Sequence, residues 1–555
     1  MRKLMRSTTA LVTAAACALG GALPAYASTM NGPSGIAKIG HIVVIYAENH
    51  SFDEEFGDFP GANGLKNVRP PYYVQRDRDG SVLPNLPSTW NGVIDSHEVT
   101  PNGQALTQIP PAATASMPNA PFSINGKSGL NLPATVATRD LYHRFYENQM
   151  QIDGGKNDKY AAWADSGGLT MGHYDHDNHF GHSGASNDQH PLWDLAKEWV
   201  LADNFYQGAF GGSYLNHQYL ICACANTFTP AQQTRATSGG GTVTVPVSAL
   251  NADGVSLTTA ANSPVSALTG PPVFVASTNL TPFDSAAGVY YGVNTMQPAY
   301  APSGNGIGTP QTGVNMDAAT TVPPQTNTTI GDLLSAKGVS WTWYAAGMQY
   351  AIDHGVYNGA AGLDPRGNIV PNFQAHHNPF NYYANYATGT QARADHLKDG
   401  GLAGAAFLAD VDAGKLPAVT FYKPQGNTNS HPGYTDLTSG DEHIIDVVRH
   451  LQHSPQWKDM VIVITYDELG GQFDHVAPPK ADRFGPGTRV PAIIISPFAK
   501  QHKVDHTQYD TSSILKLITE RYSLPVLAGL KQRDDALLAH HGVRNGDLTA
   551  QLRLR

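Results

Sequence analysis

Two pairs of oxygen-bearing side chains stand close after apolar runs, and their types suit the binding of a cation. Glu48 and Asn49 follow the run IVVIYA, and Asp467 and Glu468 follow the run VIVIT. Converging carboxylates repel each other unless a cation lies between them, and carboxylate and amide oxygens are ligands for divalent metals. Either pair taken alone is also typical of an exposed loop or a helix cap. If both runs are strands of one parallel sheet, their ends meet, and we expect one divalent metal ion there.

Ser213 is the candidate nucleophile, because it follows Gly211 and Gly212 in a segment that allows a close approach. A hydroxyl in the first turn of a helix has backbone N–H groups pointing at whatever is attached to it, which suits a phosphoryl group. The same position also fits an ordinary helix cap, so the segment alone leaves both interpretations open. Beside a metal, Ser213 would attack phosphorus in line and form a phosphoserine that water hydrolyses.

The chain is rich in histidine, with 23 among 555 residues. Imidazole has a pKa of about 6.5, so histidines can act as acids, as bases or as metal ligands, and they favour activity at mildly acid pH. The segment 172–182 has a histidine at every third residue. That spacing suits a second metal site, whereas the glycine, aspartate and asparagine content of the segment favours a solvated polar loop.

The elements that must position these groups are strands alternating with helices. Runs that are apolar on both faces predict buried strands at 42–47, 339–344, 418–422, 461–465 and 491–496. Apolar residues spaced by three and four predict helices at 191–199, 441–452 and 511–522. This alternation indicates an α/β fold whose mostly parallel sheet is covered by helices on both sides.

One long segment, at 226–330, has a different composition. It holds only four charged residues among many Gly, Thr, Pro, Ala and Asn, and parts of it alternate like exposed strands. We interpret it as a β-rich insertion of strands and loops in the main domain. Such a segment either covers the mouth of an active site or decorates the surface.

The start of the chain predicts export. A basic start and an apolar stretch precede the sequence AYA, which ends at Ala27, so we expect a signal peptide at 1–27, one main folded domain at 28–555, and a secreted or periplasmic protein. Only Cys222 and Cys224 follow it, and they form either a tight disulfide or two buried thiols. No other apolar stretch is long enough to predict a membrane span. The net charge of −10 argues against nucleic acid as a partner.

Five blocks of sequence resemble the bacterial phosphoesterase family, which includes phosphocholine-specific phospholipases C and secreted acid phosphatases. They are ENHSFD from Glu48, the Ser213 segment, HHNPF from His376, the His431 region, and YDELGGQFDHVAPP from Tyr466. The blocks occur in family order over about residues 39–522, and the last is the most specific. The resemblance implies a core sheet like that of alkaline phosphatase and a covalent intermediate on a metal-bound hydroxyl.

The resemblance also implies roles for single residues. The expected metal ligands are Glu48, Asn49, Ser213, Asp467 and Glu468, although some acid phosphatases have a second Asp in place of Glu468. The expected catalytic residues are Ser213, His143, His376, His377 and His431. Among the histidines, we expect His377 or His431 to protonate the leaving group and His143 to contact a phosphate oxygen. Serine at 213 is similar to the acid phosphatase branch, since the phospholipase branch usually has Thr.

Together these features predict a secreted, metal-dependent acid phosphatase that hydrolyses small phosphate monoesters through a phosphoserine. A phospholipase C that acts on phospholipid head groups is the alternative, because it shares the mechanism and differs in the leaving group. A secreted binding protein without turnover is the alternative from another class. The identity of the metal, the physiological substrate and the oligomeric state have no signature in the sequence.

Overall fold

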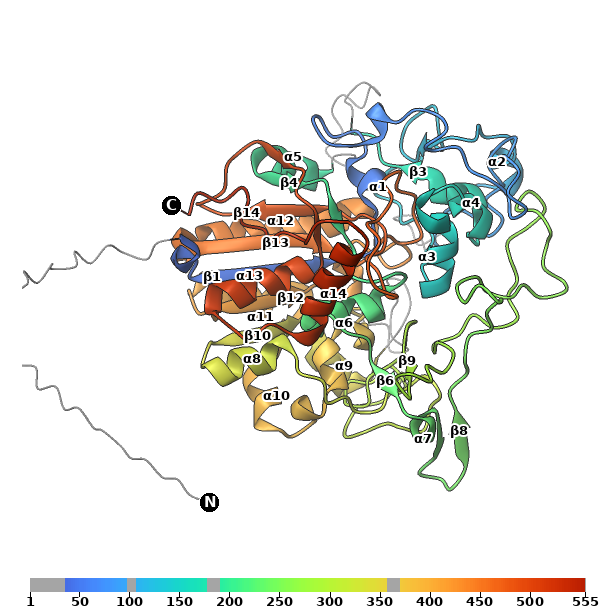
Figure 1. Cartoon of the computed structure of the whole chain (residues 1–555). Helices are drawn as coiled ribbons and strands as arrows, with labels where there is room; N and C mark the ends of the chain where they lie inside the picture. The colour runs from blue at the N-terminus through green and yellow to red at the C-terminus, as the bar shows by residue number, and fades with distance from the viewer. Residues whose placement is uncertain (1–34, 97–105, 177–189, 357–369, 555) are drawn as a thin grey trace, which may run out of the picture.

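The structure is a computed structural model. It describes residues 35–96, 106–176, 190–356 and 370–554. The expected signal peptide and two of the four histidines in the 172–182 segment, His179 and His182, lie outside these residues. At the centre is an eight-stranded sheet in the order β11-β10-β12-β1-β13-β14-β4-β15 (Figure 1).

The strands of this sheet are almost wholly apolar because both faces are covered. They are β1 (His41–Ala47), β4 (Val200–Ala202), β10 (Trp341–Ala345), β11 (Leu397–Asp399), β12 (Val419–Lys423), β13 (Met460–Tyr466), β14 (Ala492–Ile495) and β15 (Lys503–Asp505). β1 pairs in parallel with both β12 and β13, and only β14 runs antiparallel to its neighbours, β13 and β4. The expected α/β class with a mostly parallel sheet is confirmed.

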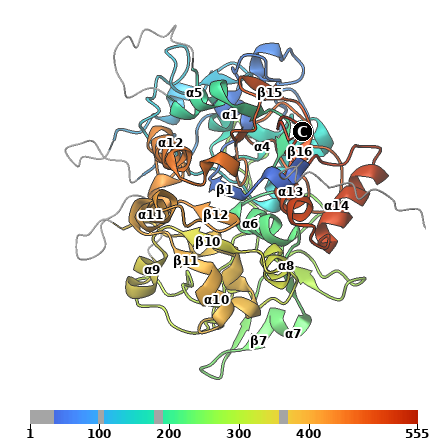
Figure 2. The same cartoon turned by 90° about the vertical axis from the view of Figure 1, so that its left-hand side faces the viewer.

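Helices cover both faces of the sheet (Figure 2). They are α5 (Pro191–Glu198), α6 (Ser213–Cys222), α8 (Ile330–Lys337), α9 (Met348–His354), α10 (Gln391–His396), α11 (Ala405–Asp412), α12 (Leu437–His453), α13 (Ser512–Tyr522) and α14 (Ala528–Ala539). α11 and α12 lie on one face, and α6, α8 and α13 lie on the other. α12 begins earlier than the apolar pattern predicts, because the side chain of Asp436 accepts a hydrogen bond from the backbone N–H of Ser439.

The residues between β1 and β4 build a loop-rich lobe beside the carboxyl end of the sheet (Figure 1). Its elements are α1 (Phe52–Phe56), α2 (Pro111–Thr114), β2 (Phe122–Ser123), α3 (Phe145–Ile152), α4 (Tyr160–Trp163) and β3 (Gly172–His173). The lobe has its own apolar cluster, in which Leu86, Leu141 and Leu169 pack with Phe473 from the loop after β13. This cluster holds the lobe against the end of the sheet where the polar pairs emerge.

The segment 226–330 contains short elements joined by long loops. They are β6 (Thr227–Phe228), α7 (Pro230–Gln233), β7 (Thr234–Ala236), β8 (Thr242–Thr244) and β9 (Tyr290–Tyr291). The remaining strands, β5 (Phe205–Tyr206) and β16 (Tyr509–Asp510), form a separate parallel pair. A disulfide joins Cys222 to Cys224 at the end of α6. None of the helices in the described part of the chain combines the length and the apolar character that crossing a membrane requires.

A fully buried arginine ties the lobe to the sheet. The Nη2 of Arg489 donates to Asp53 on α1 at 2.9 Å, and its Nε donates to Asp474 in the loop after β13 at 3.1 Å. A third hydrogen bond runs from Nη1 to the carbonyl oxygen of Asp203 just after β4. Three segments that lead to the polar end of the sheet therefore share one guanidinium.

We expect Arg489→Met to lower the free energy of unfolding by about 3–5 kcal/mol, because Asp53 and Asp474 would lose a buried positive charge. Urea denaturation followed by circular dichroism measures the change. The matched control is Arg449→Met on the exposed side of α12, for which we expect a change within about 0.5 kcal/mol. Equal stabilities of the two variants would contradict the role given to this ion-pair network.

Candidate active site

Ser213 is the first residue of α6 and is held there by close backbone packing. Gly211 has φ +80°, and a Cβ at this position would lie 2.3 Å from the backbone nitrogen of Phe145. The chain can therefore turn tightly into α6 only with glycine at position 211. The turn aims the hydroxyl of Ser213 at the end of β1, where its Oγ lies 3.1 Å from Glu48 Oε2 and 3.5 Å from Asn49 Oδ1.

The parallel pairing of β1 and β13 brings the two polar pairs together. Ala47 lies opposite Tyr466, so Glu48 and Asn49 leave the sheet beside Asp467. The backbone N–H of Asn49 donates to Oδ1 of Asp467 at 3.3 Å. Asn49 has φ +65°, a left-handed conformation that asparagine tolerates better than most residues. The structure thus places Glu48, Asn49, Ser213 and Asp467 around one point.

Glu468 has a different orientation from Asp467. Its Oε2 accepts a hydrogen bond from the backbone N–H of Gly470 at 2.7 Å, and its Oε1 lies 3.6 Å from Nε2 of His143. Of the expected metal ligands, Glu468 is the one without a direct contact to Ser213 or Asn49 among the hydrogen bonds of the described residues.

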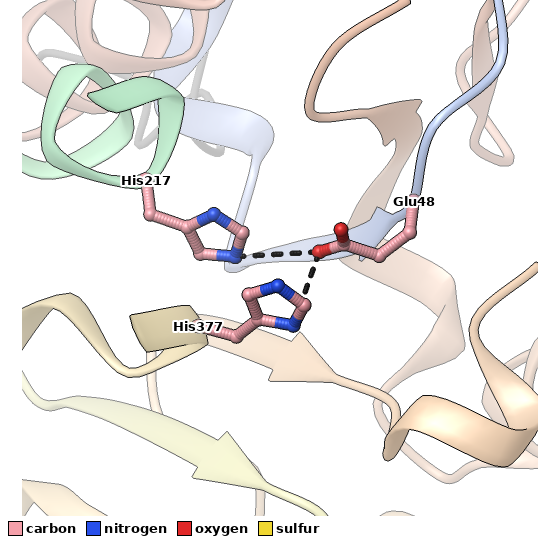
Figure 3. Close-up of side chains that lie close together, drawn as sticks. All are labelled: Glu48, His217 and His377. Carbon is pink, nitrogen blue, oxygen red and sulfur yellow. Dashed lines mark ion pairs between the residues drawn. The ribbon is translucent and has the colours of Figure 1, made fainter. Parts of the chain in front are cut away.

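Two histidines approach Glu48 from other elements (Figure 3). His217 from α6 places Nε2 3.7 Å from Glu48 Oε1, and His377 places Nδ1 3.3 Å from the same oxygen. The two rings stack with centroids 4.9 Å apart. His217 Nδ1–H donates to the carbonyl oxygen of Ser213 at 2.8 Å, which leaves its Nε2 lone pair facing the carboxylate. Burial lowers the pKa of both imidazoles well below its usual value, so both are neutral.

Sequence reasoning missed His217 and Lys423. His217 stands four residues after Ser213, which puts both on one helix face, and this spacing could have identified it. Lys423 ends β12, the strand beside β1, and its buried ammonium pairs with Glu48 and donates to the carbonyl oxygen of Tyr46. In the sequence, only its position at the end of a predicted strand of the same sheet indicates that Lys423 lies near the site.

Burial and the proximity of like charges disfavour the ionised form of the carboxyl groups at this site. Burial, and then the charge of Asp467, raise the pKa of Glu48 to about 8, although Lys423 opposes the shift. Burial also raises the pKa of Asp467, and it raises that of Glu468 well above its usual value against the opposing charge of His143. All three side chains are completely buried. Carboxylates in such a place need a compensating positive charge beyond Lys423.

The donor set fits a divalent cation. Within the described part of the chain, the buried atoms of the site that make no hydrogen bond include Asp467 Oδ2, Glu468 Oε1, His217 Nε2 and His377 Nε2. One atom each from Glu48, His217 and His377 lies within 4.8 Å of the others, a spacing at which a metal can be held. Hard oxygens together with neutral imidazole nitrogens suit several divalent metals.

A pocket of about 360 Å³ opens beside Ser213. His143, His376 and His431 are among the residues that line it, whereas His377 is not among them and contacts Glu48. The insertion also lines the pocket, through Ser277, Asn279, Asn294 and Thr295. The segment 226–330 is therefore part of the pocket wall and not only a surface decoration.

Hydrogen bonds distinguish the pocket histidines from one another. His431 Nε2 accepts from Asn49 Nδ2 at 2.8 Å, and its Nδ1–H donates to the carbonyl oxygen of Pro432, so both nitrogens are engaged. His143 Nδ1 lies 2.7 Å from the carbonyl oxygen of Leu141 and 3.1 Å from Oδ1 of Asp140. This fixes the ring of His143 and leaves Nε2 as its free end, close to Glu468.

The histidine-rich segment 172–182 is described only as far as His176. His173, Asp58 and Asp175 form a half-buried group whose candidate ligand atoms lie within 4.8 Å of one another. His176 is half-buried, and its Nε2 donates to the carbonyl oxygen of Glu55 at 2.9 Å. The segment is thus in contact with α1, whereas its predicted metal binding stays a prediction.

Gly470 controls the position of Asn49. A Cβ at Gly470 would lie 2.3 Å from the carbonyl oxygen of Asn49. We expect Gly470→Ala to displace Asn49 and to lower phosphoesterase activity by about 100-fold, the scale of effects from small misplacements of catalytic groups. The control Gly254→Ala has a similar φ of +70° but nothing within 4 Å of the added Cβ. Steady-state rates of the two variants test this, and equal activities would contradict the contact.

Several phospholipases C are similar to part of this chain. Phospholipase C B of Mycobacterium tuberculosis is 28% identical over 220 residues, which cover 35% of this chain and 38% of that protein. Non-specific phospholipase C6 of Arabidopsis thaliana is 31% identical over 151 residues, covering 21% and 28%. Non-hemolytic phospholipase C of Burkholderia pseudomallei is 28% identical over 176 residues, covering 26% and 25%. Each match thus spans less than two fifths of the relative's length.

Solved structures resemble this chain only at low scores. A protein of the alkaline phosphatase superfamily from Vibrio parahaemolyticus has a TM-score of 0.23 and 13% identity, covering 41% of this chain and 52% of that chain. A putative sulfatase from Bacteroides thetaiotaomicron has a TM-score of 0.28 and 11% identity, covering 62% and 68%. The α/β class therefore rests on the sheet itself. A model of the phosphoesterase family, in contrast, matches residues 39–525, and this chain belongs to the phosphoesterase family.

Proposed function

We propose that this protein is an exported, metal-dependent phosphoester hydrolase that transfers the phosphoryl group of its substrate to Ser213. One observation carries the proposal: the hydroxyl of Ser213, the first residue of α6 and part of the pocket lining, lies 3.1 Å from Glu48 and 3.5 Å from Asn49. If Ser213 only capped α6, its position at the helix start would be explained, but the buried carboxylates around its hydroxyl would not be.

Each group has a separate task in this reaction. One divalent cation, held by Glu48, Asn49 and Asp467 beside Ser213, would supply Lewis-acid chemistry and charge neutralisation. Ser213 Oγ attacks phosphorus in line, the alcohol leaves, and water then hydrolyses the phosphoserine to release phosphate. The backbone N–H groups of the first turn of α6 face the attached phosphoryl oxygens. Positioning and charge dominate such a transfer.

We assign the proton for the leaving alcohol to His143. Its Nδ1 contacts Asp140 and the carbonyl oxygen of Leu141, and the residue lines the pocket with its Nε2 3.6 Å from Glu468. His431 makes hydrogen bonds at both ring nitrogens, and His377 is not among the residues that line the pocket, so we consider these two expected residues less suitable for this task. His431 instead orients Asn49. His376 lines the pocket with a buried, unpartnered Nδ1 and remains available to contact substrate.

The substrate class that we propose is small phosphate monoesters. Most of the side chains that line the pocket are polar or charged, among them Arg139, Arg144, Asn279 and Asn294, which supports a hydrophilic phosphorylated ligand. Serine at position 213 supports the same choice. A phospholipase C activity is the second candidate, because several relatives are phospholipases C.

Export to the periplasm or the medium is part of the same proposal. The sequence of residues 1–27 has the pattern of a signal peptide. The disulfide between Cys222 and Cys224 supports an oxidising compartment, since cytosolic thiols are kept reduced.

We expect Ser213→Ala to lower the hydrolysis of p-nitrophenyl phosphate by at least about 1000-fold, because the nucleophile is lost. Acid quenching of the wild type with labelled substrate should trap a phosphoserine at 213. The control Ser238→Ala lies on the exposed part of the insertion. Phosphatidylcholine vesicles form the second arm, and faster turnover there would favour the phospholipase. Absence of turnover in both arms, with metal supplied, would favour a binding protein.

A series of leaving groups tests the assignment of His143. We expect His143→Gln to lower kcat/KM for glycerol phosphate by about 100-fold or more and that for p-nitrophenyl phosphate far less, because nitrophenolate leaves without a proton. His453→Gln, exposed at the end of α12, serves as the control. Equal losses on both substrates would assign His143 to phosphate binding instead.

A further inference from the structure

A second cluster of ionisable side chains lies where three helices meet, away from the pocket. Glu55 belongs to α1, His190 is the residue before α5, and Asp441 lies in the first turns of α12. α5 packs directly against α12, and α1 lies beside them (Figure 2). One potential ligand atom from each of the three residues lies within 4.8 Å of the other two.

These three side chains are buried and lack hydrogen bonds. The side chains of Glu55 and Asp441 are fully buried, and that of His190 is 1% exposed. Within the described residues, neither oxygen of either carboxylate and neither ring nitrogen of His190 makes a hydrogen bond. Yet Nδ1 of His190 lies 2.9 Å from Asp441 Oδ2, and Nε2 lies 3.9 Å from Glu55 Oε2. Buried polar atoms without partners are rare and point to a missing ligand.

The charges around the cluster do not balance. His50, whose Nδ1 lies 2.9 Å from Glu54 Oε2 and 3.7 Å from Glu55 Oε1, is the cation closest to the two glutamates among the ion pairs of the described residues. A single imidazole, even when protonated, supplies at most one positive charge to the three carboxyl groups of Glu54, Glu55 and Asp441, and carboxylates buried without a compensating charge cost free energy.

We propose that Glu55, His190 and Asp441 bind a structural divalent transition-metal ion, separate from the ion beside Ser213. Two carboxylates and one imidazole nitrogen form a ligand set that suits Zn²⁺ and similar ions. The two positive charges of the ion would compensate the two carboxylates, and the metal bonds would use atoms that make no hydrogen bond within the described residues. The ion would link α1, α5 and α12. It would thereby hold α1 in place, and α1 begins three residues after Asn49.

The test counts tightly bound Zn²⁺ by elemental analysis after loading the full-length purified protein with Zn²⁺ and removing the excess. The proteins are the wild type, Asp441→Asn, and the control Asp446→Asn, whose side chain is 56% exposed on the same helix. We expect Asp441→Asn to lose one Zn²⁺ per chain relative to the wild type and Asp446→Asn to lose none. His190→Gln is the second variant, with the same expectation, if Asp441→Asn does not fold.

A variant of the other site separates this proposal from the proposed function. Asp467→Asn should still bind one Zn²⁺ per chain and should show a higher Tm with Zn²⁺ than without it, whether or not the wild type hydrolyses phosphoesters. The double variant Asp441→Asn/Asp467→Asn should bind no Zn²⁺, and its Tm should be the same with and without Zn²⁺. The proposal is overturned if folded Asp441→Asn or His190→Gln binds as much Zn²⁺ as the wild type, or if Asp467→Asn binds none.

Discussion

The site depends on keeping three carboxylates out of water beside a serine hydroxyl. Glu48, Asp467 and Glu468 are completely buried at the end of the sheet, and burial raises the pKa of each. Lys423 supplies one positive charge to Glu48. The remaining charge requires a cation, and the same cation would bring Ser213 and a phosphoryl group together. One cation would thus have two functions. It would compensate the buried negative charge of the folded protein, and it would act as the electrophilic catalyst.

The rest of the molecule holds these carboxylates in place. The register of β1 against β13 sets Glu48 and Asn49 beside Asp467. The loop after β13 is fixed by Arg489, which pairs with Asp474 and with Asp53 on α1. Because the strands and the ion pairs are all buried, the site has little freedom to relax when no ligand is bound. A preorganised site of this kind suits electrostatic catalysis.

Much of the fold could be predicted from the sequence because buried strands leave uninterrupted apolar runs. β1, β12 and β13 all lie within one or two residues of the expected runs, and the polar pairs after β1 and β13 lie at one edge of the sheet, as parallel pairing requires. The direction of β14 could not be predicted, because apolar content is the same in parallel and antiparallel strands. Lys423, His217 and the Asp140–His143 contact depend on distances between segments remote in the chain, which periodicity does not encode. The expected roles of His377 and His431 depended on resemblance, and the hydrogen bonds of each ring were needed to separate them.

The insertion places four of its residues in the pocket wall, while Ser213 and the carboxylates come from α6 and the sheet. The reacting groups and part of the surface that meets the rest of the substrate therefore belong to different stretches of chain. A change in the loops on either side of β9 would alter the shape of the pocket wall without disturbing the strand register that holds the proposed reactive groups. This arrangement would let relatives diversify in the molecules they accept while the bond-breaking chemistry stays constant, and it makes the loops the natural place to graft a new selectivity.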